Sequence, residues 1–91
     1  TDNYFEQYVY EKPTVFVVQG KEVVVTSRRL ADALANLSEQ RRTVLLMNFF
    51  LGYSERKIGN EYGRSRSTVN YWKLAALKQL RKELEETEHE E

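Results

Sequence analysis

Residues 54–73, which read SERKIGNEYGRSRSTVNYWK, contain two helix starts and one helix stop in quick succession. Ser54 and Ser65 each precede a run of helix-forming residues, and serine is a preferred N-cap because its hydroxyl accepts a hydrogen bond from the first helical turn. Gly63 lies between the two runs, where glycine adopts the positive φ of a tight turn at little cost. The sequence therefore predicts two helices whose relative orientation is restricted by a very short connection.

Apolar residues in this unit recur on the sides that would face each other. Ile58 and Tyr62 belong to the first helix, and Val69 and Trp72 belong to the second, at helical spacing. Gly59 carries no β-carbon, so it allows the two elements to approach closely. Two helices joined in this way, the second with polar and cationic residues at its beginning, form a helix-turn-helix.

When the apolar side of the second helix points inward, helical geometry turns a set of polar side chains outward. Arg66 can donate two hydrogen bonds to guanine, Asn70 can pair with adenine in the same bidentate manner, and Ser67 can adapt to several bases. We therefore expect residues 65–82 to be a recognition helix that enters the major groove of double-stranded DNA. The predicted base contacts are Arg66, Ser67, Asn70 and Tyr71, and the predicted phosphate contacts are Arg56, Lys57, Arg64, Ser65 and Lys73.

The charges of the chain are segregated although their sum is zero. Residues 38–82 contain 10 basic and 3 acidic residues, whereas residues 83–91 contain 6 acidic residues and no Lys or Arg. A basic segment of this kind favours binding to nucleic acid. Carboxylates at a helix C-terminus oppose its dipole, so the last helix is expected to fray beyond about Leu84. The acidic tail is then either solvated or lies over the basic helices, where it would compete with phosphate.

Residues 14–26, TVFVVQGKEVVVT, are dense in β-branched side chains around Gly20 and Lys21. They predict a hairpin with these two residues as its turn, because glycine is preferred at the first position of one common two-residue turn. Both faces of this ribbon are apolar, and an isolated two-stranded ribbon is only marginally stable in water. It must therefore pack on the helices, on a second copy or on a partner protein, and a flap over the domain's own core is the preferred interpretation.

Two further helices are predicted between the hairpin and the helix-turn-helix. Ser27 caps a short helix that reaches Asn36, and Ser38 caps another that ends before Gly52. The interior of the second, TVLLMNFFL, is apolar on nearly all sides, so it is either central to the bundle or exposes a second apolar face to a partner. The predicted fold is mainly α, a helix-turn-helix bundle of about four helices with an N-terminal β-hairpin. Its parts are an aromatic segment and hairpin (1–26), the helix-turn-helix domain (27–84) and an acidic tail (85–91).

The composition argues against an enzyme. The chain has no cysteine, a single histidine within the acidic tail, no glycine-rich phosphate loop and no paired carboxylates on a core element. We therefore expect no catalytic residues, no metal site and no cofactor. No apolar run approaches the roughly 18 residues that a membrane span needs, and no secretory signal precedes the hairpin, so the expected location is the cytoplasm.

The stretch from Leu37 to Leu84 resembles the promoter-recognition domain, region four, of bacterial sigma factors. The resemblance rests on LSEQRRTVL, GYSERKIGNEYGRSRSTV and ALKQLRK, which occur in the order and spacing of that family. It implies that the last helix enters the major groove of the upstream promoter element, with base contacts from Arg66, Ser67, Asn70 and Tyr71. It also implies that the helices before the turn dock on the flap of RNA polymerase. Arg64 departs from the family pattern, in which this turn position is usually aliphatic.

Nothing in the chain resembles the sigma domain that melts the downstream promoter element. The resemblance therefore implies a small stand-alone sigma-like protein or one subunit of a split sigma factor. Two function classes stay open: a transcription regulator that binds DNA and touches RNA polymerase core, and a protein-interaction adaptor whose residues 1–26 bind a partner protein. The same N-terminal residues could instead form a homodimer by pairing hairpin edges. The net charge of the helix-turn-helix region favours the DNA-binding class.

Overall fold

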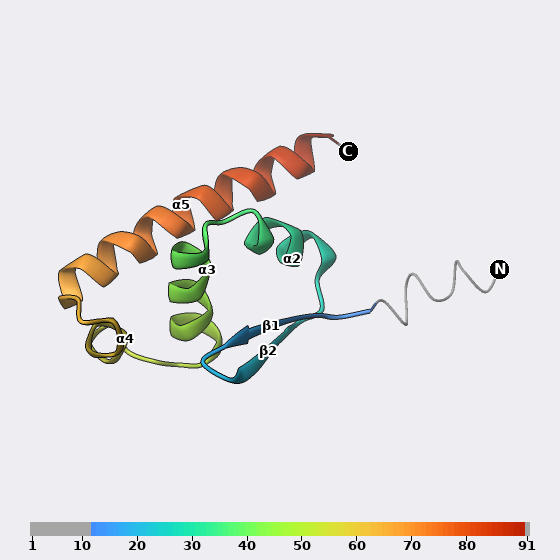
Figure 1. Ribbon diagram of the computed structural model, residues 1–91. Coiled ribbons are helices and arrows are strands. Elements are labelled where there is room, and N and C mark those ends of the chain that lie inside the picture. Colours follow the sequence, from blue (N-terminus) through green and yellow to red (C-terminus); the bar gives the residue numbers. More distant parts are fainter. Residues whose placement is uncertain (1–11, 91) are drawn as a thin grey trace.

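The computed structural model describes the backbone of residues 12–90 and the side chains of residues 12–86. Within this range the fold is a β-hairpin followed by four α-helices, as predicted (Figure 1). The elements are β1 (Thr14–Val18), β2 (Lys21–Val25), α2 (Arg28–Ala35), α3 (Glu39–Leu45), α4 (Glu55–Tyr62) and α5 (Arg66–Glu90), and a π-helical turn, η1 (Leu46–Phe50), continues α3. The aromatic segment predicted at the N-terminus lies, up to residue 11, outside the described residues.

All four α-helices begin at the serines that the sequence indicates. Each serine hydroxyl accepts a hydrogen bond from the backbone N–H three residues further on, at 3.1–3.2 Å. These bonds satisfy one of the donors that every helix leaves unpaired in its first turn. The capping residues are Ser27, Ser38, Ser54 and Ser65.

The hairpin turn differs by one residue from the predicted one. Gln19 and Gly20 form the turn, with φ of 50° and 77°, and Val18 pairs with Lys21. Positive φ at both central positions is the backbone of a type I′ turn, whose twist suits the flanking strands, so glycine fills the second central position and not the first. Because this difference shifts the strand pairing by two residues, every side chain stays on its expected face of the ribbon.

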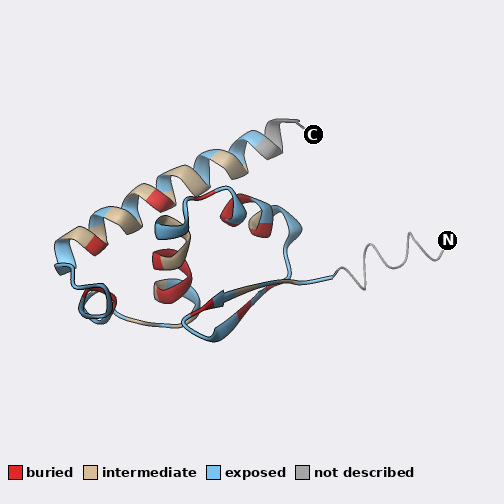
Figure 2. Ribbon diagram, in the orientation of Figure 1, coloured by how far each residue is buried: buried red, intermediate tan, exposed pale blue. Residues whose placement is uncertain are grey.

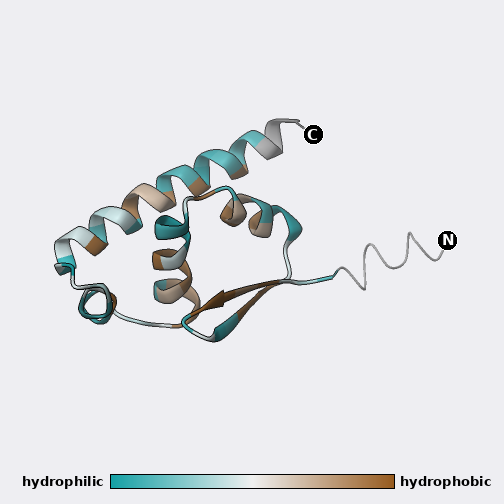
Figure 3. Cartoon of the chain, in the orientation of Figure 1, coloured by the Kyte–Doolittle hydropathy of each residue, from teal (hydrophilic) through white to brown (hydrophobic). Residues whose placement is uncertain are grey.

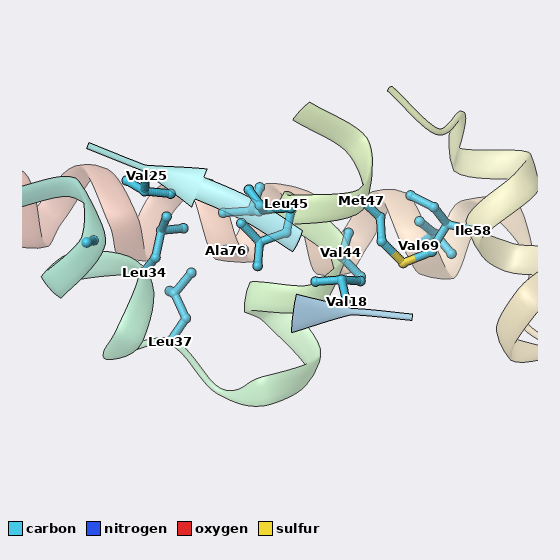
Figure 4. Close-up of a cluster of buried hydrophobic side chains, with 13 residues drawn as sticks. Val18, Val25, Leu34, Leu37, Val44, Leu45, Met47, Ile58, Val69 and Ala76 are labelled. Atoms are coloured by element: carbon cyan, nitrogen blue, oxygen red, sulfur yellow. The ribbon is translucent and has the colours of Figure 1, made fainter. Parts of the chain in front are cut away.

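The hairpin packs one face on the helices, which confirms the flap interpretation. Val18, Val23 and Val25 are buried and join the core formed by the helices (Figures 2 and 4). Both strands are rich in hydrophobic residues (Figure 3), and three valines of the opposite face are exposed: Val15, Val17 and Val24 are 47%, 67% and 52% exposed. The remaining core residues are Ala31, Leu34, Leu37, Val44, Leu45, Leu46, Met47, Ile58, Val69 and Ala76.

Helix α5 is longer than expected. It continues through the first carboxylates to Glu90 and does not end near Leu84. The guanidinium of Arg29 on α2 donates a hydrogen bond to the carbonyl of Leu84 at 3.0 Å, and Arg41 on α3 donates one to Gln79 at 2.7 Å. Because each residue adds about 1.5 Å to a helix, the acidic end of α5 lies roughly 36 Å from its start. Residues 85–90 therefore do not lie over the helix-turn-helix, and the end of α5 lies far from α4 (Figure 1).

The junction between α4 and α5 is closed by backbone contacts. Gly63 has a φ of 64° and ends α4, and the N–H of Arg64 donates to the carbonyl of Gly59 at 2.8 Å. A β-carbon added to Gly59 would lie 2.5 Å from the carbonyl oxygen of Arg64, which belongs to the backbone and cannot rotate away. The turn thus stays closed with arginine at position 64, and Gly59 allows this approach.

Substitution of Gly59 by alanine should lower the free energy of unfolding by about 1–3 kcal/mol, the usual cost of forcing an extra carbon into a packed site. Thermal and urea unfolding followed by circular dichroism would measure the loss. Asn60→Ala is the matched control, because Asn60 is the exposed neighbour on the same helix. Equal stability of the two variants would contradict the close approach at Gly59.

Candidate nucleic-acid interface

The inner side of the helix-turn-helix is held by a small apolar contact. Ile58 and Val69 are fully buried and lie beside Met47 in the core (Figure 4). Trp72 packs against the same core while partly exposed. Tyr62 contributes less than expected, since it is 43% exposed and its hydroxyl donates to the sulfur of Met47 at 3.6 Å. Ile58 and Val69 therefore carry most of the contact that fixes the angle between α4 and α5.

Three of the four predicted base-contact residues lie on the exposed side of α5 near its start. Arg66, Ser67 and Tyr71 are exposed, and Tyr71 is 69% exposed. This exposure follows directly from the burial of Val69, as the helical spacing predicts.

The fourth, Asn70, is engaged inside the domain. Its side-chain nitrogen donates to Oε2 of Glu55, the first residue of α4, at 2.8 Å. The same oxygen forms an ion pair with the ammonium of Lys73 at 2.7 Å, and Oε1 of Glu55 lies 3.7 Å from Nε of Arg66. One carboxylate on α4 thus contacts three side chains on α5, and we call this set the Glu55 cluster: Glu55, Arg66, Asn70 and Lys73.

The contacts within the Glu55 cluster differ in strength. The side chains of Glu55 and Lys73 are 14% and 20% exposed, whereas that of Arg66 is 71% exposed. Hydrogen bonds from Lys73 and Asn70 lower the pKa of Glu55, and the charges of Lys73 and Arg66 add to this against the opposing effect of burial. The lowered pKa indicates that Glu55 stabilises the folded state as a carboxylate, chiefly through Lys73.

Glu55 is the residue that the sequence does not reveal as functional. At the first position of a helix an acidic residue is expected for reasons of the helix dipole alone. Its contacts with α5 depend on the angle between the two helices, which local sequence does not specify. The same holds for Lys73, which the sequence suggests as a free phosphate contact and which forms an ion pair inside the domain instead.

The other predicted phosphate contacts lie on the surface around the turn. Arg56, Lys57 and Arg64 are exposed. The hydroxyl of Ser65 is occupied by the N–H of Thr68 at 3.1 Å, so an anion would be met there by the free backbone N–H groups at the start of α5.

The hairpin brings a further cation to this region through Tyr53. The ammonium of Lys57 lies over the Tyr53 ring, 4.2 Å from its centre, and Lys21 donates a hydrogen bond to the Tyr53 hydroxyl at 2.6 Å. Lys21 is therefore held at the hydroxyl end of the ring, beside the first turn of α4. This position links the hairpin turn to the basic surface, a contact that the sequence alone does not predict.

With this geometry established, comparison with known families gives one clear match. The family profile described as "Sigma-70, region 4" matches residues 27–80, more than half of the chain. The chain belongs to the sigma-70 region 4 family. No curated protein matches it.

Membership in the sigma-70 region 4 family supports a sigma-like role in DNA binding and promoter recognition. The matched residues run from the cap of α2 to Leu80 and so contain α4, the turn, the first 15 residues of α5 and the Glu55 cluster. The hairpin precedes the match. Within the described residues, no group of acidic or histidine side chains is arranged to hold a metal ion, and none of their helices is long and apolar enough to cross a membrane.

The region 4 domain also has an apolar surface away from the turn. Helix α3 buries Val44 and Leu45 at its end, and the π-helical turn that continues it buries Leu46 and Met47 but exposes Phe49 (57%) and Phe50 (44%). Leu74 on α5 is 55% exposed. Residues 43–51 therefore fit both interpretations of their apolar sequence, because the segment contributes to the core and also exposes an apolar face at its end. The two phenylalanines line a hollow together with Leu30, Leu34, Leu45, Leu77 and Leu80.

Glu55 makes the stability of the domain depend on pH in a defined direction. Its pKa is lower in the folded state, so its contribution is present above its ordinary pKa of 4.5 and is lost as the pH falls through the folded value. Glu55→Gln should therefore be less stable than the parent at pH 7, and the gap should narrow below about pH 4.5. Urea unfolding at several pH values would measure this gap. Glu61→Gln, on the exposed side of the same helix, sets the baseline for loss of one charge. A gap that stays constant down to pH 3 would contradict the role of Glu55.

Proposed function

We propose that this chain is a sequence-specific DNA-binding regulator of transcription that recognises a promoter by placing residues 65–82 of α5 in the major groove. The observation that carries the proposal is the exposed start of α5, where Arg66, Ser67 and Tyr71 project from a helix whose Val69 is fully buried. Major-groove readers need this combination of a fixed inner face and a polar outer face. A promoter-binding role also places the protein with the chromosome, in the bacterial cytoplasm.

In this proposal the roles of the side chains follow their chemistry. Arg66, Ser67, Asn70 and Tyr71 meet base edges, and Arg56, Lys57, Arg64 and the backbone at Ser65 meet phosphates. Lys73 reaches a phosphate only when it leaves Glu55. No step of this function requires a cofactor or a catalytic residue.

We also propose that the apolar surface at η1 and α5 binds RNA polymerase core. Phe49, Phe50 and Leu74 are exposed there, and surfaces of this kind on small domains commonly bind other proteins. A lone helix-turn-helix reads few base pairs, so attachment to polymerase would supply the remaining affinity. The surface adjoins the Glu55 cluster, because the ammonium of Lys73 lies over the Phe49 ring, 5.8 Å from its centre.

A second candidate is an adaptor or a split sigma subunit in which the hairpin binds a partner protein. The exposed row of Val15, Val17 and Val24 favours it, because β-branched residues left in water on a two-stranded ribbon are suited to a covering partner or to a second hairpin in a homodimer. In the adaptor the helix-turn-helix serves as a scaffold, whereas in the split sigma subunit it remains the DNA-binding part.

Selection of bound duplexes from a random pool, with and without RNA polymerase core, would test the proposed function. Enrichment of one sequence by the chain alone indicates an independent regulator, and enrichment only with core indicates a sigma-like subunit. Failure to enrich any sequence under both conditions would overturn the proposal of promoter recognition.

Arg66→Ala should cost roughly 1–3 kcal/mol on the selected duplex and relax base preference at one position. Arg56→Ala should instead weaken binding to selected and random duplexes alike and reduce the salt dependence by about one phosphate contact, since phosphates carry no sequence information. Fluorescence anisotropy at several salt concentrations would separate the two effects. Equal losses on both duplexes for both variants would reject base reading by Arg66.

Phe50→Ser should abolish binding to polymerase core while affinity for DNA in the absence of core is retained. Val17→Ser is the matched control, because it also truncates an exposed apolar side chain, but on the hairpin. Pull-down with purified core, with thermal unfolding to confirm the fold of both variants, would measure the difference. Loss of core binding by Val17→Ser and not by Phe50→Ser would favour the hairpin as the polymerase contact.

A further inference from the structure

We propose that Glu55 sets the ratio of specific to non-specific DNA binding, because it withholds Lys73 from phosphates and fixes the amide orientation of Asn70. The inference rests on the proposed function, in which α5 enters the major groove. Glu55 makes no base contact in this mechanism. It is a positioning residue that acts through two side chains of the recognition helix.

Lys73 is the first part of the argument. Non-specific affinity for DNA comes almost entirely from cations that meet phosphates. Lys73 has its ammonium 2.7 Å from Oε2 of Glu55, and both side chains are largely buried. To reach a phosphate, Lys73 must break this short ion pair, which leaves the largely buried negative charge of Glu55 without its main counter-charge. Lys73 therefore adds little to the affinity for a duplex that offers only phosphates.

Arg66 is held less tightly than Lys73 by the same carboxylate. Its Nε lies 3.7 Å from Oε1 of Glu55, and its side chain is 71% exposed. This contact is longer than a hydrogen bond and is screened by water, so it holds the guanidinium weakly. Arg66 can turn to a guanine edge while Lys73 stays in place. Glu55 thus neutralises Lys73 but leaves Arg66 able to contact a base.

Asn70 is the second part of the argument. An ionised carboxylate only accepts hydrogen bonds, so the amide end that faces Glu55 must be the nitrogen, as the 2.8 Å contact has it. One amide hydrogen is used in this bond. The carbonyl oxygen and the second hydrogen remain, and they match the amino group and N7 that adenine presents in the major groove. Glu55 therefore selects one of the two amide orientations before DNA arrives.

The position of Glu55 also opposes phosphate directly. Its side chain lines a shallow hollow together with Ser54, Arg56 and Lys73, beside the first turn of α4. Helix starts of this kind attract anions. A carboxylate in the hollow repels a phosphate that would otherwise bind to Arg56 and Lys73 together, and repulsion of the wrong ligand is an efficient source of specificity.

The test is a double-mutant cycle on DNA affinity with wild type, Glu55→Gln, Lys73→Met and the double variant, all as the full chain. Glu61→Gln is the charge-matched control, because it removes one acidic group from the same helix outside the Glu55 cluster. Affinity for a random duplex and for the selected duplex would be measured by anisotropy between about 50 and 200 mM salt, a range over which one phosphate contact is worth roughly threefold.

Glu55→Gln should bind the random duplex more tightly than Glu61→Gln does, with an additional loss of roughly threefold across that salt range. Lys73→Met should bind the random duplex nearly as tightly as wild type does. In the double variant, Lys73→Met should abolish the increase in random-duplex affinity that Glu55→Gln causes alone. The ratio of specific to random affinity should fall in Glu55→Gln. Identical affinities of Glu55→Gln and Glu61→Gln for the random duplex would overturn the proposal. It would also be overturned if Lys73→Met, made in the otherwise wild-type chain, bound the random duplex clearly more weakly than wild type.

A measurement without DNA tests the role of Glu55 separately from the proposed promoter recognition. The side-chain amide resonances of Asn70 in a ¹⁵N-labelled protein should shift in Glu55→Gln and stay in place in Glu61→Gln. If wild type binds no duplex, the proposed function fails irrespective of these resonances. If wild type binds DNA and Glu55→Gln leaves both the resonances and the random-duplex affinity at control values, only the role of Glu55 fails.

Discussion

The contact between Gly59 and the backbone of Arg64 is the constraint on which the recognition surface depends. A β-carbon at Gly59 would lie 2.5 Å from the Arg64 carbonyl oxygen, so the turn can close this tightly only over glycine. The closed turn brings the first residue of α4 beside the second turn of α5, which allows the Glu55 carboxylate to reach Asn70 and Lys73. A slightly wider angle would separate these groups and leave Lys73 in water. In the proposed mechanism, packing of backbone against backbone thus determines which cations of the helix are available to DNA.

The other elements hold a long helix that could not remain rigid alone. Helix α5 is anchored near its middle by Arg41, which donates to Gln79, and towards its end by Arg29, which donates to the Leu84 carbonyl. The hairpin covers the core with its inner valines and reaches the start of α4 through the hydrogen bond from Lys21 to Tyr53. Long helices are stabilised mainly by tertiary packing of one face, and here that packing comes from α2, α3 and α4. The N-terminal hairpin therefore supports the DNA-binding unit and also adds a lysine to its basic side.

Features that depend on neighbouring residues could be predicted from sequence, and features that depend on angles between elements could not. The four serine caps, the glycine turn and the burial of Val69 follow from local chemistry and helical periodicity, and all are found as expected. The hairpin turn was misplaced by one residue because glycine suits either central position. Helix α5 continues to Glu90, beyond the predicted end near Leu84, and the bond from Arg29 holds it as far as Leu84. Glu55 was missed because its three partners are brought to it only by the crossing of two helices.

The charge along α5 changes sign, from positive in its earlier turns to negative near its end. Its first turns lie in a segment of net positive charge, whereas residues 83–91 carry 6 acidic groups and the helix continues to Glu90. Because the helix is continuous, its acidic groups begin at Glu83, roughly 26 Å from the first residue of α5, about three Debye lengths at physiological salt. DNA attracts one end and repels the other, so the field favours encounters in which the recognition end arrives first. In the proposed mechanism, a zero net charge limits non-specific attraction to DNA at long range, and Glu55 limits it at contact.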